Sequence, residues 1–362
     1  MRGNQRVRFG LRGLGAMLGA GLILAACSGA GTPTAAPTSA AATGPAATVG
    51  PTANPLATKT LEIAYLSFAV ANSYDAPMLA AAQAAAAAGN AKLTVFDANL
   101  DVPTQTKQLQ DAVASGKFDA ILIQPLFGAG LIEDTKAAIA AGIYVGNVDQ
   151  TLGADFTTAA SQVEGLSSNV AFVASELGRK IGELVVKACA TTNPCNVGYI
   201  WSVKAAALDG ALKVAFDKAI AVNPAIKIVS DDGQSYYTTA LGLAASQNII
   251  AAHSDVTVIV SADQAITGAV DAVKAAGLQA QVKLVGYGGG TIAFQGIKAG
   301  LRFGTVMQMP ATEGRLGVEQ LIKAIRTGVA QPGFDPLSTL QDGGVVTIEN
   351  VDAFLTLGEW PG

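Results

Sequence analysis

Histidine is nearly absent from this chain, which contains His253 as its single example in 362 residues. Because histidine serves much acid–base catalysis and many metal sites, its scarcity argues against that chemistry. The sequence also lacks a G-x-S-x-G elbow, an H-E-x-x-H pair and a G-x-x-x-x-G-K-[ST] phosphate loop. A pair of carboxylates acting as a glycosidase stays open as an alternative. We nevertheless expect a protein that is not an enzyme and that needs no cofactor or metal.

Charged residues are also scarce, at 14% of the chain. Lys and Arg number 23 against 27 Asp and Glu, which leaves a net charge of −4. No basic stripe is present, so nucleic acid is not an expected partner. Half of the residues are hydrophobic, and a chain of this length suits about two domains.

Residues 1–27 have the pattern of an export signal. A short apolar stretch at 14–24 follows a basic region that contains Arg2, Arg6, Arg8 and Arg12. The stretch is too short to span a membrane as a helix, which favours a signal peptide. It ends in Leu-Ala-Ala-Cys27, which resembles the bacterial lipobox and implies that Cys27 carries lipid. The alternative is an ordinary signal with a chance cysteine.

Residues 28–59 consist mostly of Ala, Thr, Pro, Gly and Ser. Such a segment cannot bury enough apolar surface to offset its conformational entropy, so we expect a disordered tether. A flexible coil of this length reaches roughly 30 Å. The folded part would then lie just off the membrane.

Two further cysteines, Cys189 and Cys195, flank the turn-rich sequence ATTNP. In an exported chain this spacing predicts a disulfide, which would stabilise the fold by roughly 2 kcal/mol. The alternative, a metal site, is poor because His253 is far away in the sequence.

From Thr60 onward, short apolar runs alternate with helix-like segments. We predict strands at 61–67, 92–96, 119–124, 143–148, 196–201, 226–230, 256–261, 282–286, 303–307 and 345–348. We predict helices at 77–88, 103–115, 131–141, 169–188, 205–222, 238–252, 265–276, 292–299 and 312–327. Repeated βα units of this size predict an α/β protein with two Rossmann-like lobes, each built on a parallel sheet.

Ligands of open parallel sheets bind beyond the carboxyl ends of the strands. The residues that follow the predicted strands are rich in amides, carboxylates and aromatic rings, which suit a small neutral polar molecule such as a sugar or polyol. From this set we select as ligand-binding Asn72, Tyr74, Asp75, Asp149, Gln150, Trp201, Tyr236, Asp263 and Gln308. Other readings remain: a Tyr can simply cover a sheet edge, and Asp263 can cap the helix that follows it.

Six segments together resemble the ribose-type periplasmic sugar-binding proteins, which serve ABC importers. They are IAYLSFAVANSYDAPM (63–78), DAILIQP (119–125), GIYVGNVDQ (142–150), VTVIVSADQAITGAVDAVKAAG (256–277), KLVGYGGG (283–290) and FGTVMQMP (303–310). The resemblance implies two lobes joined by three crossings, which close around the ligand. It places Asn72, Tyr74, Asp149, Tyr236 and Gln308 at ligand-contacting positions.

The lobe boundaries follow from the same resemblance. The first lobe would comprise 60–165 and 308–340, and the second 166–307 and 341–362. The crossings would then lie near Gly165, Gln308 and Gln341.

The chain departs from the family pattern where the family grips hydroxyl groups. Gln150 stands where the family usually has Arg, Ala262 where it has Asn, and Gly288 where it has a ligand Asp. A second Arg is missing near Gly210 and Leu212. Because an Arg fork holds paired hydroxyls through several donors, its loss argues against ribose or glucose. The loop GYGGGT (286–291) also lacks the ending of a phosphate loop.

We therefore expect a monomeric, extracytoplasmic lipoprotein that delivers a small neutral solute to an ABC permease and its ATPase. It would lie in the periplasm or on the outer face of the cytoplasmic membrane. Two alternatives remain: a sensor whose closed form is presented to a receptor, and a hydrolase on the same two-lobed plan.

Overall fold

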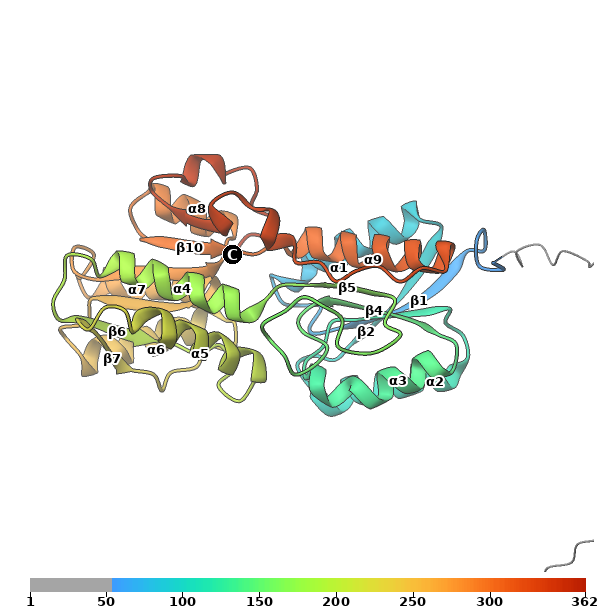
Figure 1. The fold of residues 1–362 in the computed structure, drawn as a ribbon. Coiled ribbons are helices and arrows are strands. Elements are labelled where there is room, and N and C mark those ends of the chain that lie inside the picture. Colours follow the sequence, from blue (N-terminus) through green and yellow to red (C-terminus); the bar gives the residue numbers. More distant parts are fainter. Residues whose placement is uncertain (1–53) are drawn as a thin grey trace, which may run out of the picture. The chain divides into compact units, whose positions relative to one another are not determined.

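Residues 54–362, which the computed structural model describes, form two lobes of alternating strands and helices (Figure 1). The predicted signal peptide, Cys27 and most of the predicted tether lie outside the described residues. None of the helices in residues 54–362 combines the length and the apolar character that a membrane crossing requires.

The first lobe has a parallel sheet of five strands in the order β2-β1-β3-β4-β5. Its strands are β1 (Leu61–Ser67), β2 (Ala91–Asp97), β3 (Ala120–Ile123), β4 (Tyr144–Asp149) and β5 (Ser168–Ala171). One face packs on α1 (Asp75–Ala88) and α9 (Pro310–Thr327), the other on α2 (Val102–Ser115) and α3 (Ile132–Ala140) (Figure 1). Burial on both faces explains why the central strands are continuous apolar runs.

The second lobe has six strands in the order β11-β10-β9-β8-β6-β7, and only the β10–β11 pair is antiparallel among these described strands. The strands are β6 (Cys195–Tyr199), β7 (Ile226–Ser230), β8 (Val258–Ala262), β9 (Lys283–Gly288), β10 (Gly304–Met307) and β11 (Val345–Thr347). One face packs on α4 (Ala174–Ala188) and α5 (Ala207–Ile220), the other on α6 (Thr239–Ala252) and α7 (Asp263–Ala275). Helix α8 (Thr291–Lys298) covers β10 and β11. The predicted fold class, two α/β lobes on parallel sheets, is confirmed.

Local chemistry sets several helix ends. The Asp101 side chain accepts a hydrogen bond from Thr104 N at 2.8 Å, which caps the start of α2. Gly116 ends the same helix in a left-handed conformation, at φ 60°. Thr238 caps α6 through a bond from Leu241 N. The boundaries predicted from the apolar pattern therefore lie within two residues of these capping residues.

The predicted helix 169–188 is wrong in its first part. Residues 168–171 form strand β5, which pairs with β4 in parallel, and α4 begins only at Ala174. All four residues of β5 are buried. Periodicity alone does not separate so short a buried strand from the first turn of a helix.

The chain passes between the two sheets three times. The first passage follows β5, at Phe172 and Val173, so residues 166–171 do not start the second lobe as expected. The second lies at Gln308 and Met309, between β10 and α9. The third follows Phe334, which bridges to β5, and runs through two short 3₁₀ turns at Pro336–Thr339 and Gln341–Gly344 into β11.

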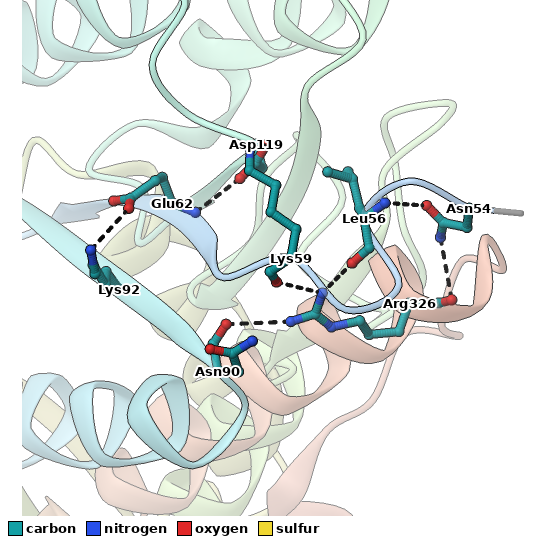
Figure 2. Close-up of polar contacts among 8 residues, drawn as sticks. All are labelled: Asn54, Leu56, Lys59, Glu62, Asn90, Lys92, Asp119 and Arg326. Carbon is teal, nitrogen blue, oxygen red and sulfur yellow. Dashed lines mark hydrogen bonds and ion pairs between the residues drawn. The ribbon is translucent and has the colours of Figure 1, made fainter.

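Arg326, near the end of α9, holds the segment that leads into β1 (Figure 2). Its Nη1 donates to the carbonyl oxygens of Leu56 and, at 2.8 Å, of Lys59. Its Nη2 donates to the carbonyls of Gly89 and Asn90, both at 3.3 Å. One guanidinium thus joins three separate pieces of the first lobe.

Asn54 and Lys59 add to this attachment (Figure 2). Asn54 Nδ2 donates to Ile325 O at 2.6 Å, and Lys59 pairs with Asp119 at 2.6 Å. The predicted tether extended to residue 59, but the structure fixes residues 54–59 to the first lobe.

Candidate functional site

A cavity lies where the carboxyl ends of the two sheets meet, and both lobes contribute to its walls. Predicted site residues that line it are Asn72, Tyr74, Asp75, Asp149, Gln150 and Gln308. Residues not selected from the sequence line it as well: Phe68, Phe172, Leu177, Leu208, Leu212, Tyr237, Ala262, Gln264, Tyr287, Gly288 and Trp360. The position agrees with the rule that ligands of open α/β sheets bind beyond the strand ends.

The loop after β1 positions Asn72 and Tyr74. Asn72 Oδ1 accepts a hydrogen bond from Tyr74 N at 2.8 Å, which closes a turn just before α1. The side-chain oxygen of Asn72 is thus engaged, while its amide group keeps its donors. The Tyr74 hydroxyl lies 3.2 Å from Glu313 Oε2 and 3.5 Å from Asp149 Oδ1.

Gln124, buried at the end of β3, aligns two carboxylates. Its Nε2 donates to Asp75 Oδ1 at 2.5 Å and to Asp149 Oδ2 at 3.1 Å. Its Oε1 accepts from Phe68 N at 3.0 Å, and Gln105 Nε2 donates to its backbone carbonyl at 2.8 Å. Because the Oε1 of Gln124 is also bonded, its side-chain amide is held in place, and its Nε2 brings the two carboxylates close together.

The end of β4 is held in an unusual conformation. Asp149 has φ 72°, in the left-handed region that residues other than glycine rarely adopt. Asn147 Nδ2 donates to Gln150 O and to Asn169 Oδ1, both at 2.7 Å, and so holds the backbone beyond Asp149. Strained backbone of this kind persists where the surrounding contacts determine it, often at functional sites.

Burial dominates the electrostatics of the acidic side of the cavity. It raises the pKa of Asp149 to about 6, although hydrogen bonds from Gln124 and its neighbours oppose the rise. Burial first, and the Asp149 charge second, raise the pKa of Asp75 and of Glu313 well above their ordinary values. Among residues 54–362 the one buried Lys or Arg is Arg302, which pairs with Asp263.

Trp360, close to the C-terminus, also lines the cavity and packs against the Tyr74 ring. The two rings meet edge to face, with centroids 5.4 Å apart. Trp360 Nε1 donates to Gly288 O at 2.9 Å, and a Cβ on Gly288 would lie 2.6 Å from the Trp360 ring. The missing side chain at Gly288 therefore makes room for Trp360. No local sequence pattern singled out Trp360, which lies in a C-terminal segment of mixed polar and apolar residues.

In the second lobe, Tyr237 and not Tyr236 lines the cavity. Tyr236 is 46% exposed, and both residues have positive φ, at 47° and 54°. The Tyr237 hydroxyl lies 3.4 Å from Asp209 Oδ2, and the Tyr287 hydroxyl lies 2.7 Å from Ser202 Oγ. This tight turn decides which ring points inward, and residue type alone did not reveal it.

Trp201 does not line the cavity. Its ring is buried against Tyr199 with centroids 5.3 Å apart, and its Nε1 donates to Asp231 O at 2.7 Å. The sequence argument assumed that a large ring at a strand end faces the ligand. Here the hydrophobic core under α5 takes the ring instead.

Asp263 is also outside the cavity, because the glycine-rich loop encloses it. It pairs with Arg302 Nη1 at 2.8 Å and accepts from Thr305 Oγ1 at 2.8 Å and from Gly289 N at 2.7 Å. A Cβ on Gly286 would lie 1.9 Å from its Oδ1. Burial raises the pKa of Asp263 even though Arg302 opposes the rise. Nor does Asp263 cap α7, whose N-cap is Ala262.

The disulfide prediction agrees with the structure, in which Cys189 and Cys195 are bonded. The bond links the end of α4 to the start of β6. Among the described residues no group of three or more His, Cys, Asp or Glu side chains is arranged to hold a metal ion.

Comparison with known proteins identifies relatives of this fold. A family profile described as "periplasmic binding protein domain" matches residues 63–328. A curated protein named D-ribose/D-allose-binding protein, from Pseudomonas aeruginosa, is 28% identical over 235 residues, which are 63% of this chain and 67% of that protein.

Two solved structures are similar over nearly their whole length. An ABC transporter solute-binding protein from Mycobacterium smegmatis, with bound glycerol, has a TM-score of 0.70 at 24% identity and covers 84% of this chain and 99% of its own. One from Actinobacillus succinogenes, with bound D-allose, has a TM-score of 0.68 at 25% identity and covers 81% and 99%.

Proposed function

The chain belongs to the periplasmic binding protein domain family, and on that premise we propose that it captures a small polar solute between its lobes for an ABC importer. The observation that carries this proposal is the cavity, to which both lobes contribute side chains. A solute that contacts both lobes binds the closed arrangement better than an open one and so shifts the population toward closure. The closed form is then the form that the permease receives.

The side chains of the cavity favour a sugar-like or polyol-like frame. Amide groups of Asn72, Gln150 and Gln308 offer donors and acceptors for hydroxyl groups. The rings of Tyr74 and Trp360 offer apolar faces for the C–H side of such a ring. The named ligands of the relatives, glycerol, D-allose and D-ribose, are of this kind.

A binding titration tests the proposal. A thermal-shift screen of sugars, polyols, amino acids and purines should find a stabilising solute, because a hundredfold excess over Kd stabilises by about 2.7 kcal/mol. Gln308→Ala should weaken that solute at least tenfold, since Gln308 lies both on a crossing and on the cavity wall. Gln295→Ala, on the exposed side of α8, is the matched control. Equal affinity of the two variants would count against the site.

We also propose that the chain is exported, monomeric and held at the membrane by lipid on Cys27. The support is the sequence pattern alone, and one acyl chain gives only marginal attachment whereas two give stable attachment. Cys27→Ser should move the protein from the membrane fraction to the soluble fraction and abolish labelling with palmitate. Retention in the membrane fraction without label would contradict the anchor.

A further inference from the structure

We propose that the solute carries a positively charged amine, as an amino sugar or amino polyol does, because the cavity sets buried carboxyl groups beside aromatic rings. This inference rests on the proposed function and narrows it, since the sequence alone suggested a neutral solute. It assigns a charge to the ligand that neither the family nor the named ligands of its relatives imply.

Three elements bring carboxyl groups to one side of the cavity. Asp75 from α1 and Asp149 from β4 line the cavity and share the Gln124 amide, at 2.5 and 3.1 Å. Glu313 from α9 lies behind them, joined through the Tyr74 hydroxyl, which is 3.2 Å from Glu313 and 3.5 Å from Asp149. Their exposed fractions are 4%, 3% and 0% for Asp75, Asp149 and Glu313.

Within the described residues, no cation compensates these groups. The lining of the cavity contains no Lys, Arg or His. Arg302, the buried arginine of residues 54–362, is already paired with Asp263 in the second lobe. Gln150 follows Asp149 directly and brings no charge. Because a buried carboxylate without a counter-charge is costly, this side of the cavity favours a ligand that supplies one.

A second observation points to a hydrogen-bond donor. Glu313 Oε1 has no hydrogen-bond donor from the protein although the residue is fully buried, and the Tyr65 hydroxyl beneath the cluster is also unpartnered. Without a ligand, Glu313 satisfies that oxygen when it holds a proton toward Asp149. When a cation binds nearby and the cluster ionises, that proton is released to the solvent. An ammonium group carries several N–H donors and no acceptor, so it matches a cluster of acceptors.

The aromatic wall fits the same ligand. Tyr74 is both a partner of the carboxyl groups and one of the rings, and Trp360 meets it edge to face at 5.4 Å. Tyr237 and Tyr287 face the cavity from the second lobe. The faces of such rings attract cations within about 6 Å, Trp most strongly. They also accept the C–H face of a sugar, so an amine on a sugar or polyol frame uses both properties.

Proton linkage gives the proposal a distinctive signature. Burial raises the pKa of Asp75, Asp149 and Glu313, so the cluster holds protons at mildly acidic pH. A bound cation lowers those pKa values, so its binding releases protons and strengthens as pH rises through them. The other ionisable groups that act on the cluster are Asp97, Asp335 and the two tyrosines Tyr65 and Tyr74, none of which is a cation. A neutral polyol is not bound more tightly when the cluster loses its protons, so its affinity should not depend on pH in this way.

Matched pairs of probes test the inference on the mature protein. D-Glucosamine is compared with D-glucose, and serinol with glycerol, by calorimetry and thermal shift at pH 5.5 and pH 7.5. We expect at least one amine to bind at least tenfold more tightly than its neutral partner at pH 7.5, and to weaken at least about tenfold at pH 5.5. Neutral partners that bind as well, without pH dependence, would overturn the inference and leave the proposed function standing.

Two further outcomes are decisive. Stabilisation by MgCl₂ or CaCl₂ and by neither amine would overturn the inference in favour of a metal ion. If no probe of either kind bound, the charge assignment and the proposed sugar-like or polyol-like solute would both be overturned.

Variants locate the effect. Glu313→Gln keeps the shape and removes the charge, so it should lower the affinity for the bound amine about tenfold and lower any affinity for its neutral partner by much less. Glu319→Gln, on the exposed face of the same helix, is the matched control and should bind as the parent does. Equal loss of amine and neutral affinity in Glu313→Gln would indicate a structural role and overturn the assignment.

Discussion

Replacing Arg302 with Leu should destabilise the second lobe strongly. Arg302 is 5% exposed and Asp263 is fully buried, with 2.8 Å between guanidinium and carboxylate. At an effective dielectric constant of about 20, this separation gives an attraction of about 6 kcal/mol, which offsets the desolvation of both charges. Removing one partner of a buried pair typically costs about 3–5 kcal/mol, because the other charge stays buried. We expect a loss in that range for Arg302→Leu.

The remaining partners of Asp263 sharpen the expectation. Thr305 and Gly289 still donate hydrogen bonds to Asp263 in the variant. The loss of stability should therefore be smaller than the cost of burying a carboxylate that has no partner at all. Without Arg302 the pKa of Asp263 rises further, and a group whose folded-state pKa is raised adds stability only at low pH. The loss should therefore be smaller at pH 5.0 than at pH 7.5.

Urea denaturation followed by circular dichroism at the two pH values measures both effects. Arg315→Leu is the control, because Arg315 pairs with Glu319 at 2.8 Å on an exposed surface, where such pairs contribute at most about 1 kcal/mol. Equal losses for the two variants, or a loss for Arg302→Leu that does not depend on pH, would refute a buried ion pair that organises the glycine-rich loop.

Three other measurements follow from the same contacts. The free energy of unfolding should fall as pH rises from about 4 to about 7, because burial raises the pKa of the cavity carboxyl groups; Glu313→Gln should flatten that slope in thermal melts. Gly286→Ala should lower the Tm by several degrees, because its Cβ would lie 1.9 Å from a buried carboxylate, whereas Gly210→Ala meets open space and should not. Solute should change the emission of Trp360 and not that of Trp201, so Trp360→Phe should abolish the fluorescence response and Trp201→Phe should retain it.

The sequence revealed most of the fold because the signals are local. Buried parallel strands are continuous apolar runs, and the strand predicted at 61–67 has the same bounds as β1. The exception, β5, has four residues and continues directly toward a helix, so no period separates the two. Its identity depends on pairing with β4, which is a long-range contact.

The sequence predicted where the cavity lies better than it predicted which residues line it. Asp149 ends strand β4, and Asn72 and Gln308 follow strands β1 and β10, so topology alone brings them to one cavity. Which of two adjacent tyrosines faces inward depends on backbone dihedrals that the sequence does not specify. Trp360 reaches the cavity from a tail far along the chain, a placement that no local pattern encodes.

The Arg326 attachment also decides how mechanical load passes through the protein. A pulling force applied at Asn54 passes through Arg326 and Asn54 into the end of α9 and the start of β1, both in the first lobe (Figure 2). The three crossings between the sheets are not on that route. In the proposed closure, an anchor at the N-terminal segment would hold the first lobe, and the second lobe would move toward it. Tension on that segment should then leave the free energy of closure, and hence the affinity for the solute, unchanged.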